Sequence, residues 1–81
     1  MKFGIALTML QSGLCKGIRL PQWKDDVVVK LQTPDENSKM THPYIFIDTT
    51  GLETDNPDAP RDRVPWLASQ TDMLSEDWEE I

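Results

Sequence analysis

The residues best suited to recognition chemistry lie near the end of the chain, where an indole precedes a run of short hydrogen-bonding side chains. Trp66 is followed by Ser69, Gln70, Thr71 and Asp72. The S-x-x-D spacing of a capping box predicts that a helix begins at Gln70. Free backbone N–H groups at a helix start attract anions, and an indole can stack on a base. The segment indicates a nucleotide site, or else a capped helix beside a core tryptophan.

Other residue types with catalytic or metal-binding chemistry are scarce. Cys15 is the only cysteine and His42 the only histidine, which is too few for an internal disulfide or a zinc cluster. A hydrolase usually needs a histidine, a metal or a carboxylate pair. We therefore expect a protein that is not an enzyme and that holds neither a metal nor a cofactor.

The charge balance limits the kinds of partner. The 81 residues carry 14 acidic and 8 basic side chains, for a net charge of −6, without a basic cluster in the sequence. Duplex DNA or RNA is therefore an improbable ligand. An acidic surface is compatible with docking on a basic protein, or with enclosing a small anion among locally placed donors. A chain of this length forms one domain with a marginal core, which oligomerisation would stabilise.

The apolar residues do not predict a membrane segment. The sequence has no apolar run of about 20 residues, and its start lacks the pattern of a signal peptide. We therefore expect a cytoplasmic protein with no membrane association.

The hydropathy pattern predicts the elements that must position the Trp66 segment. A helix is expected over residues 3–12, ended by Gly13, with an apolar stripe of Phe3, Leu7, Leu10 and Leu14. Strands are expected at 18–20, 27–31 and 44–48, and an edge strand at 77–81 with Trp78 inward. The side chains expected in the core are Leu7, Leu10, Val28, Ile45 and Phe46.

The composition changes between residues 49 and 63, which are rich in Gly, Pro, Asp and Arg. We expect a long mobile loop there, because this stretch has no apolar face to bury. The order of elements predicts a single α+β domain over residues 1–81. In it an N-terminal helix packs on an antiparallel sheet, with a short capped helix near the C-terminus.

Three sequence blocks resemble one known family. They are the opening Met-x-Phe-Gly-x-Ala-Leu-x-x-Leu, the Arg-x-x-x-Trp that ends at Trp23, and residues 64–78, which read Val-Pro-Trp-Leu-Ala-Ser-Gln-Thr-Asp-Met-Leu-Ser-Glu-Asp-Trp. Together they resemble the Thoeris anti-defence two-like family, small domains common in bacteriophages and prophages. The resemblance covers nearly the whole chain apart from residues 49–63. Residues 40–45 also resemble a block found in one part of the family.

The resemblance implies a molecular sponge in the host cytoplasm. Family members form homo-oligomers, typically tetramers, and bind cyclic nucleotide second messengers of bacterial immunity without cleaving them. The ligands include cyclic ADP-ribose isomers of Thoeris defence and, for some members, cyclic dinucleotides of the CBASS type. Pockets lie between protomers, and the expected base-stacking tryptophans match Trp23 and Trp66. The spacing from Arg19 to Trp23 is longer here than in many relatives.

The chemistry of a cyclic nucleotide assigns roles to the remaining candidates. Arg19 and the helix start can take phosphate, and Gln70 and Thr71 can bond a base edge. Asp72 can accept from ribose hydroxyls, unless Ser69 and Asp72 are used as capping partners. Arg19 has an alternative as an ordinary salt-bridging strand residue. The family block also suggests a second, dinucleotide-type pocket lined by Lys39, Thr41 and His42.

A different class of function remains open on the sequence. The acidic surface and the 49–63 loop could block a basic site on a host defence enzyme, which would make the protein a protein–protein inhibitor. That alternative predicts a stoichiometric protein partner and insensitivity to loss of Trp66.

Overall fold

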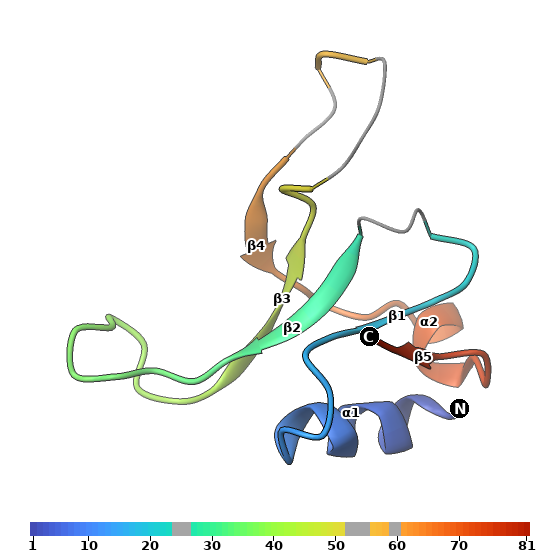
Figure 1. The fold of residues 1–81 in the computed structure, drawn as a ribbon, viewed down its shortest axis with the longest axis horizontal. Coiled ribbons are helices and arrows are strands. Elements are labelled where there is room, and N and C mark those ends of the chain that lie inside the picture. Colours follow the sequence, from blue (N-terminus) through green and yellow to red (C-terminus); the bar gives the residue numbers. More distant parts are fainter. Residues whose placement is uncertain (24–26, 52–55, 59–60) are drawn as a thin grey trace.

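The structure, a computed structural model of the chain, describes residues 1–23, 27–51, 56–58 and 61–81. In chain order the elements are α1 (Phe3–Gln11), β1 (Ile18–Arg19), β2 (Val28–Gln32), β3 (Tyr44–Asp48), β4 (Arg63–Pro65), α2 (Gln70–Leu74) and β5 (Glu79–Glu80). This is the predicted α+β arrangement, with helices at 3–11 and 70–74 and strands between and after them (Figure 1).

The five strands form one antiparallel sheet in the order β4-β3-β2-β1-β5. The longest pairing joins β2 and β3, from Val28 opposite Asp48 to Gln32 opposite Tyr44. β5 lies at one edge beside β1, which confirms the predicted edge strand near the C-terminus. β4 was not predicted, because three residues that include Pro65 carry too little strand pattern.

The core lies between α1 and one face of the sheet. Its fully buried apolar side chains are Ala6, Leu10, Ile18, Leu20, Val29 and Trp78. Trp78 is 1% exposed, so the prediction that it points inward is confirmed. Because side chains alternate along a strand, Val29 faces this core while its neighbours Val28 and Lys30 face the opposite side of the sheet.

The end of α1 shows why one predicted core residue is exposed. Gly13 has a φ of +78°, and the Gly13 and Leu14 N–H groups donate to the Leu10 and Met9 carbonyls at 3.3 and 3.0 Å. This is a Schellman motif, in which a left-handed glycine reverses the chain. The reversal takes Leu14 off the helical stripe, and Leu14 is 74% exposed. Its expected place in the stripe was wrong.

The remaining core predictions have mixed outcomes. Leu10 is buried, whereas Leu7, Val28, Ile45 and Phe46 are only half-buried. Ile45 still packs against the core cluster. Val28 and Phe46 do not, because the pairing of Val28 with Asp48 and of Phe46 with Lys30 puts both on the second face of the sheet.

The segment predicted as a 49–63 loop is closed at its base by hydrogen bonds. The Thr49 N–H donates to the Asp62 carbonyl and the Asp62 N–H to Thr49 Oγ1, both at 2.9 Å. β4 begins at Arg63, one residue inside the predicted loop, and Arg63 pairs with Asp48. Residues 52–55 and 59–60 of this loop lie outside the described residues, so its mobility stays a prediction.

Candidate functional site

Three indoles and a phenyl ring meet where the two ends of the chain come together. The Trp23, Trp66 and Trp78 rings have centroids 5.5 to 5.9 Å apart, and Phe3 lies 5.1 Å from Trp78. Trp66 is held by its N–H, which donates to the Ile45 carbonyl at 3.2 Å just beyond β4. Trp23 is held in a turn by donation to the Leu20 carbonyl at 3.0 Å. The two predicted stacking residues are therefore brought together, and both stay partly exposed.

The angles between the rings decide how these indoles could meet a base. Trp23 and Trp66 are inclined at 81°, and Trp66 and Trp78 at 72°, the edge-to-face arrangement that aromatic quadrupoles favour. Trp23 and Trp66 of one chain therefore do not form a parallel pair that could bracket a base. Trp66 is partly exposed, so a base could reach part of its ring.

The start of α2 carries the predicted capping box. Ser69 Oγ accepts from the Asp72 N–H at 3.1 Å, and Asp72 Oδ2 accepts from the Ser69 N–H at 3.4 Å. The alternative role for this pair, as helix caps, is the one seen. The Asp72 carboxylate also lies at the positive end of the helix, where it stabilises the helix. Gln70 and Thr71 are exposed, and a ligand can reach both.

Arg19 takes part in an ion pair across the edge of the sheet. Its guanidinium lies 3.5 Å from the Glu79 carboxylate, and the two residues are register partners in β1 and β5. The salt-bridging alternative for Arg19 is therefore confirmed. A phosphate at Arg19 would have to compete with Glu79.

The candidates for a second pocket lie on the connection between β2 and β3. Lys39, Thr41 and His42 are all exposed, and this connection extends away from both helices (Figure 1). The rings that contact Trp66 are instead those of Phe3, Trp23 and Trp78.

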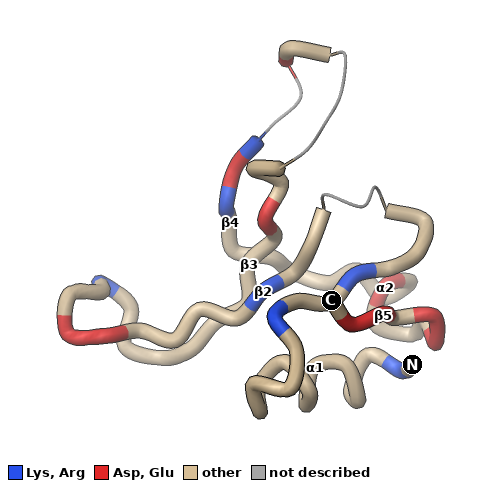
Figure 2. Tube along the Cα trace, viewed as in Figure 1, with Lys and Arg blue, Asp and Glu red and all other residues tan. Residues whose placement is uncertain are grey.

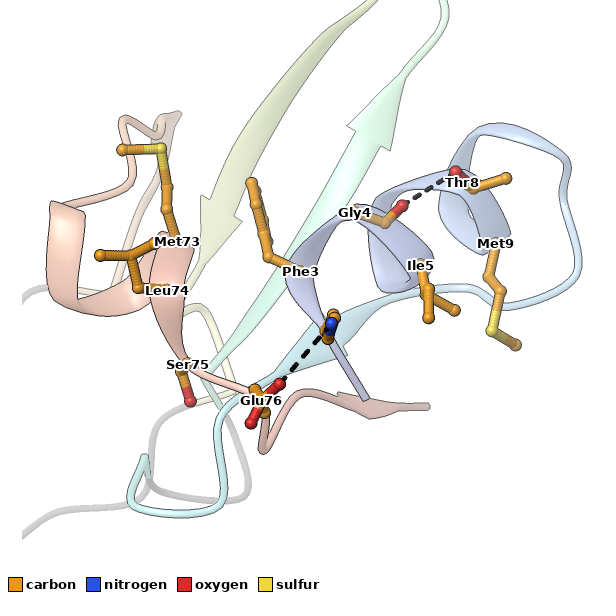
Figure 3. Close-up of a pocket in the computed structure, with 10 residues that line it drawn as sticks. Phe3, Gly4, Ile5, Thr8, Met9, Met73, Leu74, Ser75 and Glu76 are labelled. Carbon is orange, nitrogen blue, oxygen red and sulfur yellow. Dashed lines mark hydrogen bonds and ion pairs between the residues drawn. The ribbon is translucent and has the colours of Figure 1, made fainter.

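A large cavity that the sequence did not reveal lies between α1 and α2. It has a volume of about 710 Å³, and the residues that line it include Phe3, Ile5, Met9, Met73 and Leu74 (Figure 3). Phe3 connects this cavity to the indoles, with its ring 6.3 Å from Trp66. Small-molecule sites commonly have such a volume and an apolar lining. The only sequence signal was the pair of apolar residues directly after the capping box.

Cys15 is a half-buried free thiol. Burial, together with the Glu80 charge, raises the pKa of the Cys15 thiol, which keeps the thiol protonated. Within the described ranges, no three His, Cys, Asp or Glu side chains gather as a metal site would require. Nor does any helix in those ranges have the length and apolarity to cross a bilayer.

Comparison with known proteins decides the family. The model of the Thoeris anti-defense 2-like domain, or Tad2-like domain, matches residues 1–81, the whole chain. The chain belongs to the Tad2-like family. Its role is therefore Thoeris anti-defence, and the predicted resemblance is confirmed; the match also includes residues 49–63, which the resemblance left out. No curated protein matches this Tad2-like sequence.

Proposed function

We propose that this Tad2-like protein blocks Thoeris signalling by binding a cyclic nucleotide second messenger and holding it uncleaved. The observation that carries the proposal is the partly exposed Trp66 ring, fixed against Trp23 and Trp78. Stacking on an aromatic ring contributes roughly 1–3 kcal/mol per base. A ring already held by its neighbours loses little side-chain freedom when the ligand binds.

Polar groups beside Trp66 supply the rest of the recognition. Gln70 and Thr71 are exposed on the first turn of α2 and can donate to or accept from a base edge. The capping box and the bond from Trp78 Nε1 to the Asp72 carbonyl at 2.9 Å fix this turn against the aromatic cluster. The turn is therefore a rigid support next to the stacking surface.

Sequestration without turnover is part of the proposal. The single histidine, His42, is exposed on the β2–β3 connection, and the Cys15 thiol has a raised pKa. Neither is supported as a general base or nucleophile at Trp66.

Self-association in the host cytoplasm completes the proposal. Ile5 is 54% exposed, Met73 44% and Leu74 79%, and these side chains line or flank the cavity between the helices. A second copy that covered them would bury apolar surface that a small core needs. Sedimentation equilibrium measures the oligomeric state, and a strict monomer at micromolar concentration would contradict this part of the proposal.

The test is a thermal-shift and calorimetric screen with cyclic ADP-ribose isomers and cyclic di- and trinucleotides. We expect one class of these ligands to stabilise the protein. If the protein blocks both Thoeris and CBASS signalling, a CBASS-type cyclic dinucleotide should stabilise it as well. Trp66→Ala should abolish the shift, whereas Leu67→Ala should keep it, because Leu67 is the neighbouring side chain and is 92% exposed. Circular dichroism confirms that both variants are folded.

Two further readouts separate the alternatives. Intact ligand recovered after heat denaturation supports sequestration, and hydrolysed ligand would contradict it. If no ligand binds and host lysate yields a stoichiometric protein partner, the inhibitor alternative is favoured. Charge reversal at Asp58 and Asp62 then tests it; Asp55, the third acidic residue of that loop, lies outside the described residues.

A further inference from the structure

A second cavity, with a volume of about 380 Å³, lies on the second face of the sheet. Its charged and polar lining side chains are Lys16, Lys30, Asp48, Thr50 and Arg63. Figure 2 shows the basic positions on β2, on β4 and ahead of β1. Three of the eight basic residues of the chain thus line one cavity.

Asp48 organises two of these cations. Its carboxylate is 5% exposed and lies 3.1 Å from both Lys30 Nζ and Arg63 Nε. The other carboxylate oxygen accepts from the Thr50 hydroxyl at 2.6 Å and from the Thr50 N–H at 2.9 Å. The Thr50 hydroxyl first, and then the Thr50 N–H and the two cations, hold the pKa of Asp48 far below its usual range. Asp48 therefore stays ionised and fixes where Lys30 and Arg63 point.

The cations keep bonding capacity after Asp48 is satisfied. Lys30 is 40% exposed and Arg63 63% exposed. An ammonium has three donors and a guanidinium five, so both can still donate into the cavity. Lys16 makes no side-chain ion pair with any residue in the described ranges. The lining side chains thus carry three positive charges and one negative charge, in a protein with a net charge of −6.

This geometry points to a phosphate site. We propose that Lys16, Lys30 and Arg63 bind a phosphate or pyrophosphate group, with Asp48 as the residue that positions Lys30 and Arg63. Several converging cationic donors suit an anion that has several oxygens and about two charges. The cavity lies on the face of the sheet opposite Val29 and the core, so this site is distinct from the Trp66 surface.

The test uses inorganic pyrophosphate, so it does not depend on the messenger. We expect pyrophosphate to shift the ¹H–¹⁵N signals of the Gly17, Lys30 and Thr50 amides until the shifts saturate. The affinity obtained from these shifts should fall as the salt concentration rises. Lys16→Gln should weaken binding about tenfold, and this variant leaves the Asp48 bonds intact. The control is Arg61→Gln, which removes the same charge two residues before Arg63 and outside the cavity lining.

Two results would overturn the proposal. One is the absence of saturation at these amides with millimolar pyrophosphate. The other is equal weakening by Lys16→Gln and Arg61→Gln, which would show a general charge effect. If the site is present, competition identifies the source of the phosphate. Displacement of pyrophosphate by a cyclic nucleotide supports the messenger as the ligand, and binding without displacement supports a separate phosphate compound.

Discussion

Replacing Asp48 with asparagine should remove a large part of the stability of the sheet. The wild-type carboxylate accepts four hydrogen bonds, two from Thr50 and one each from Lys30 and Arg63. Asparagine keeps one acceptor oxygen for Thr50. Its amide group would then present N–H donors to the Lys30 and Arg63 donors, so the two ion pairs are lost.

The magnitude follows from the exposure of the three partners. Breaking a buried ion pair costs roughly 3–5 kcal/mol when the remaining charge stays buried. Here the remaining charges are Lys30 and Arg63, which are 40% and 63% exposed and regain water. We therefore expect Asp48→Asn to lower the free energy of unfolding by about 2–3 kcal/mol at neutral pH. For a domain of this size that corresponds to roughly 10–20 °C in Tm.

The pH dependence gives a second, independent check. The pKa of Asp48 is lowered by folding, so its contribution is fully present above its unfolded pKa of about 4. The contribution is lost progressively as the pH falls below that value toward the folded pKa. The difference in stability between wild type and Asp48→Asn should therefore narrow below pH of about 4.

Urea unfolding followed by tryptophan fluorescence measures the stability difference at neutral pH and its change at acidic pH. The protein concentration is kept fixed, because association would shift the apparent stability. Asp77→Asn is the control, since it removes the same charge from an exposed position and should change stability by less than about 0.5 kcal/mol. A loss of stability in Asp48→Asn as small as that in Asp77→Asn would refute the reasoning. A loss that is the same at neutral and acidic pH would also refute it.

Three further substitutions and one control variant test the packing and the cap of α2, each by urea unfolding. Gly17→Ala should destabilise by about 1–3 kcal/mol, because a Cβ there meets Val28 Cγ2 and lies 3.2 Å from the Val29 carbonyl oxygen. Gly4→Ala is the control and should be neutral or stabilising, because a Cβ at Gly4 would meet open space. Equal losses of stability in Gly17→Ala and Gly4→Ala would contradict this account. Ser69→Ala should lower the free energy of unfolding by about 1 kcal/mol through loss of the helix cap. An unchanged urea midpoint would contradict a stabilising role of this cap. Trp78→Ala should cost about 3–5 kcal/mol, and a smaller loss than for Trp66→Ala would show that Trp78 is not the central core residue.

Local patterns made much of the fold predictable. The Ser69–Asp72 spacing identified the start of α2, because a capping box is formed by residues three apart in the sequence. The strand at 44–48 was visible because its apolar run is bounded by turn residues. The limit of such patterns is clear at Leu14, whose spacing fits the α1 stripe although the Gly13 reversal places it in solvent.

The two cavities could not be predicted, because each depends on tertiary geometry. Asp48 is 18 positions from Lys30 and 15 from Arg63, and the three residues meet only through the register of β2, β3 and β4. The cavity between the helices likewise needs α2 to return beside α1. Trp23 and Trp66 were both expected as stacking residues, but the 81° angle between their rings arises in a cluster with Trp78, which sequence spacing does not describe.

The bond network around Trp78 also has a consequence for the order of folding during synthesis. The Trp78 N–H donates to the Met1 carbonyl at 3.0 Å, and the Met1 amine donates to the Trp78 carbonyl at 2.8 Å, across a separation of 77 residues. When α1 and the first four strands leave the ribosome, the residue that fills their shared core has not yet emerged. Ala6 and Leu10 belong to the same buried cluster as Trp78, so we expect them to stay only partly covered until it arrives and the domain to close late.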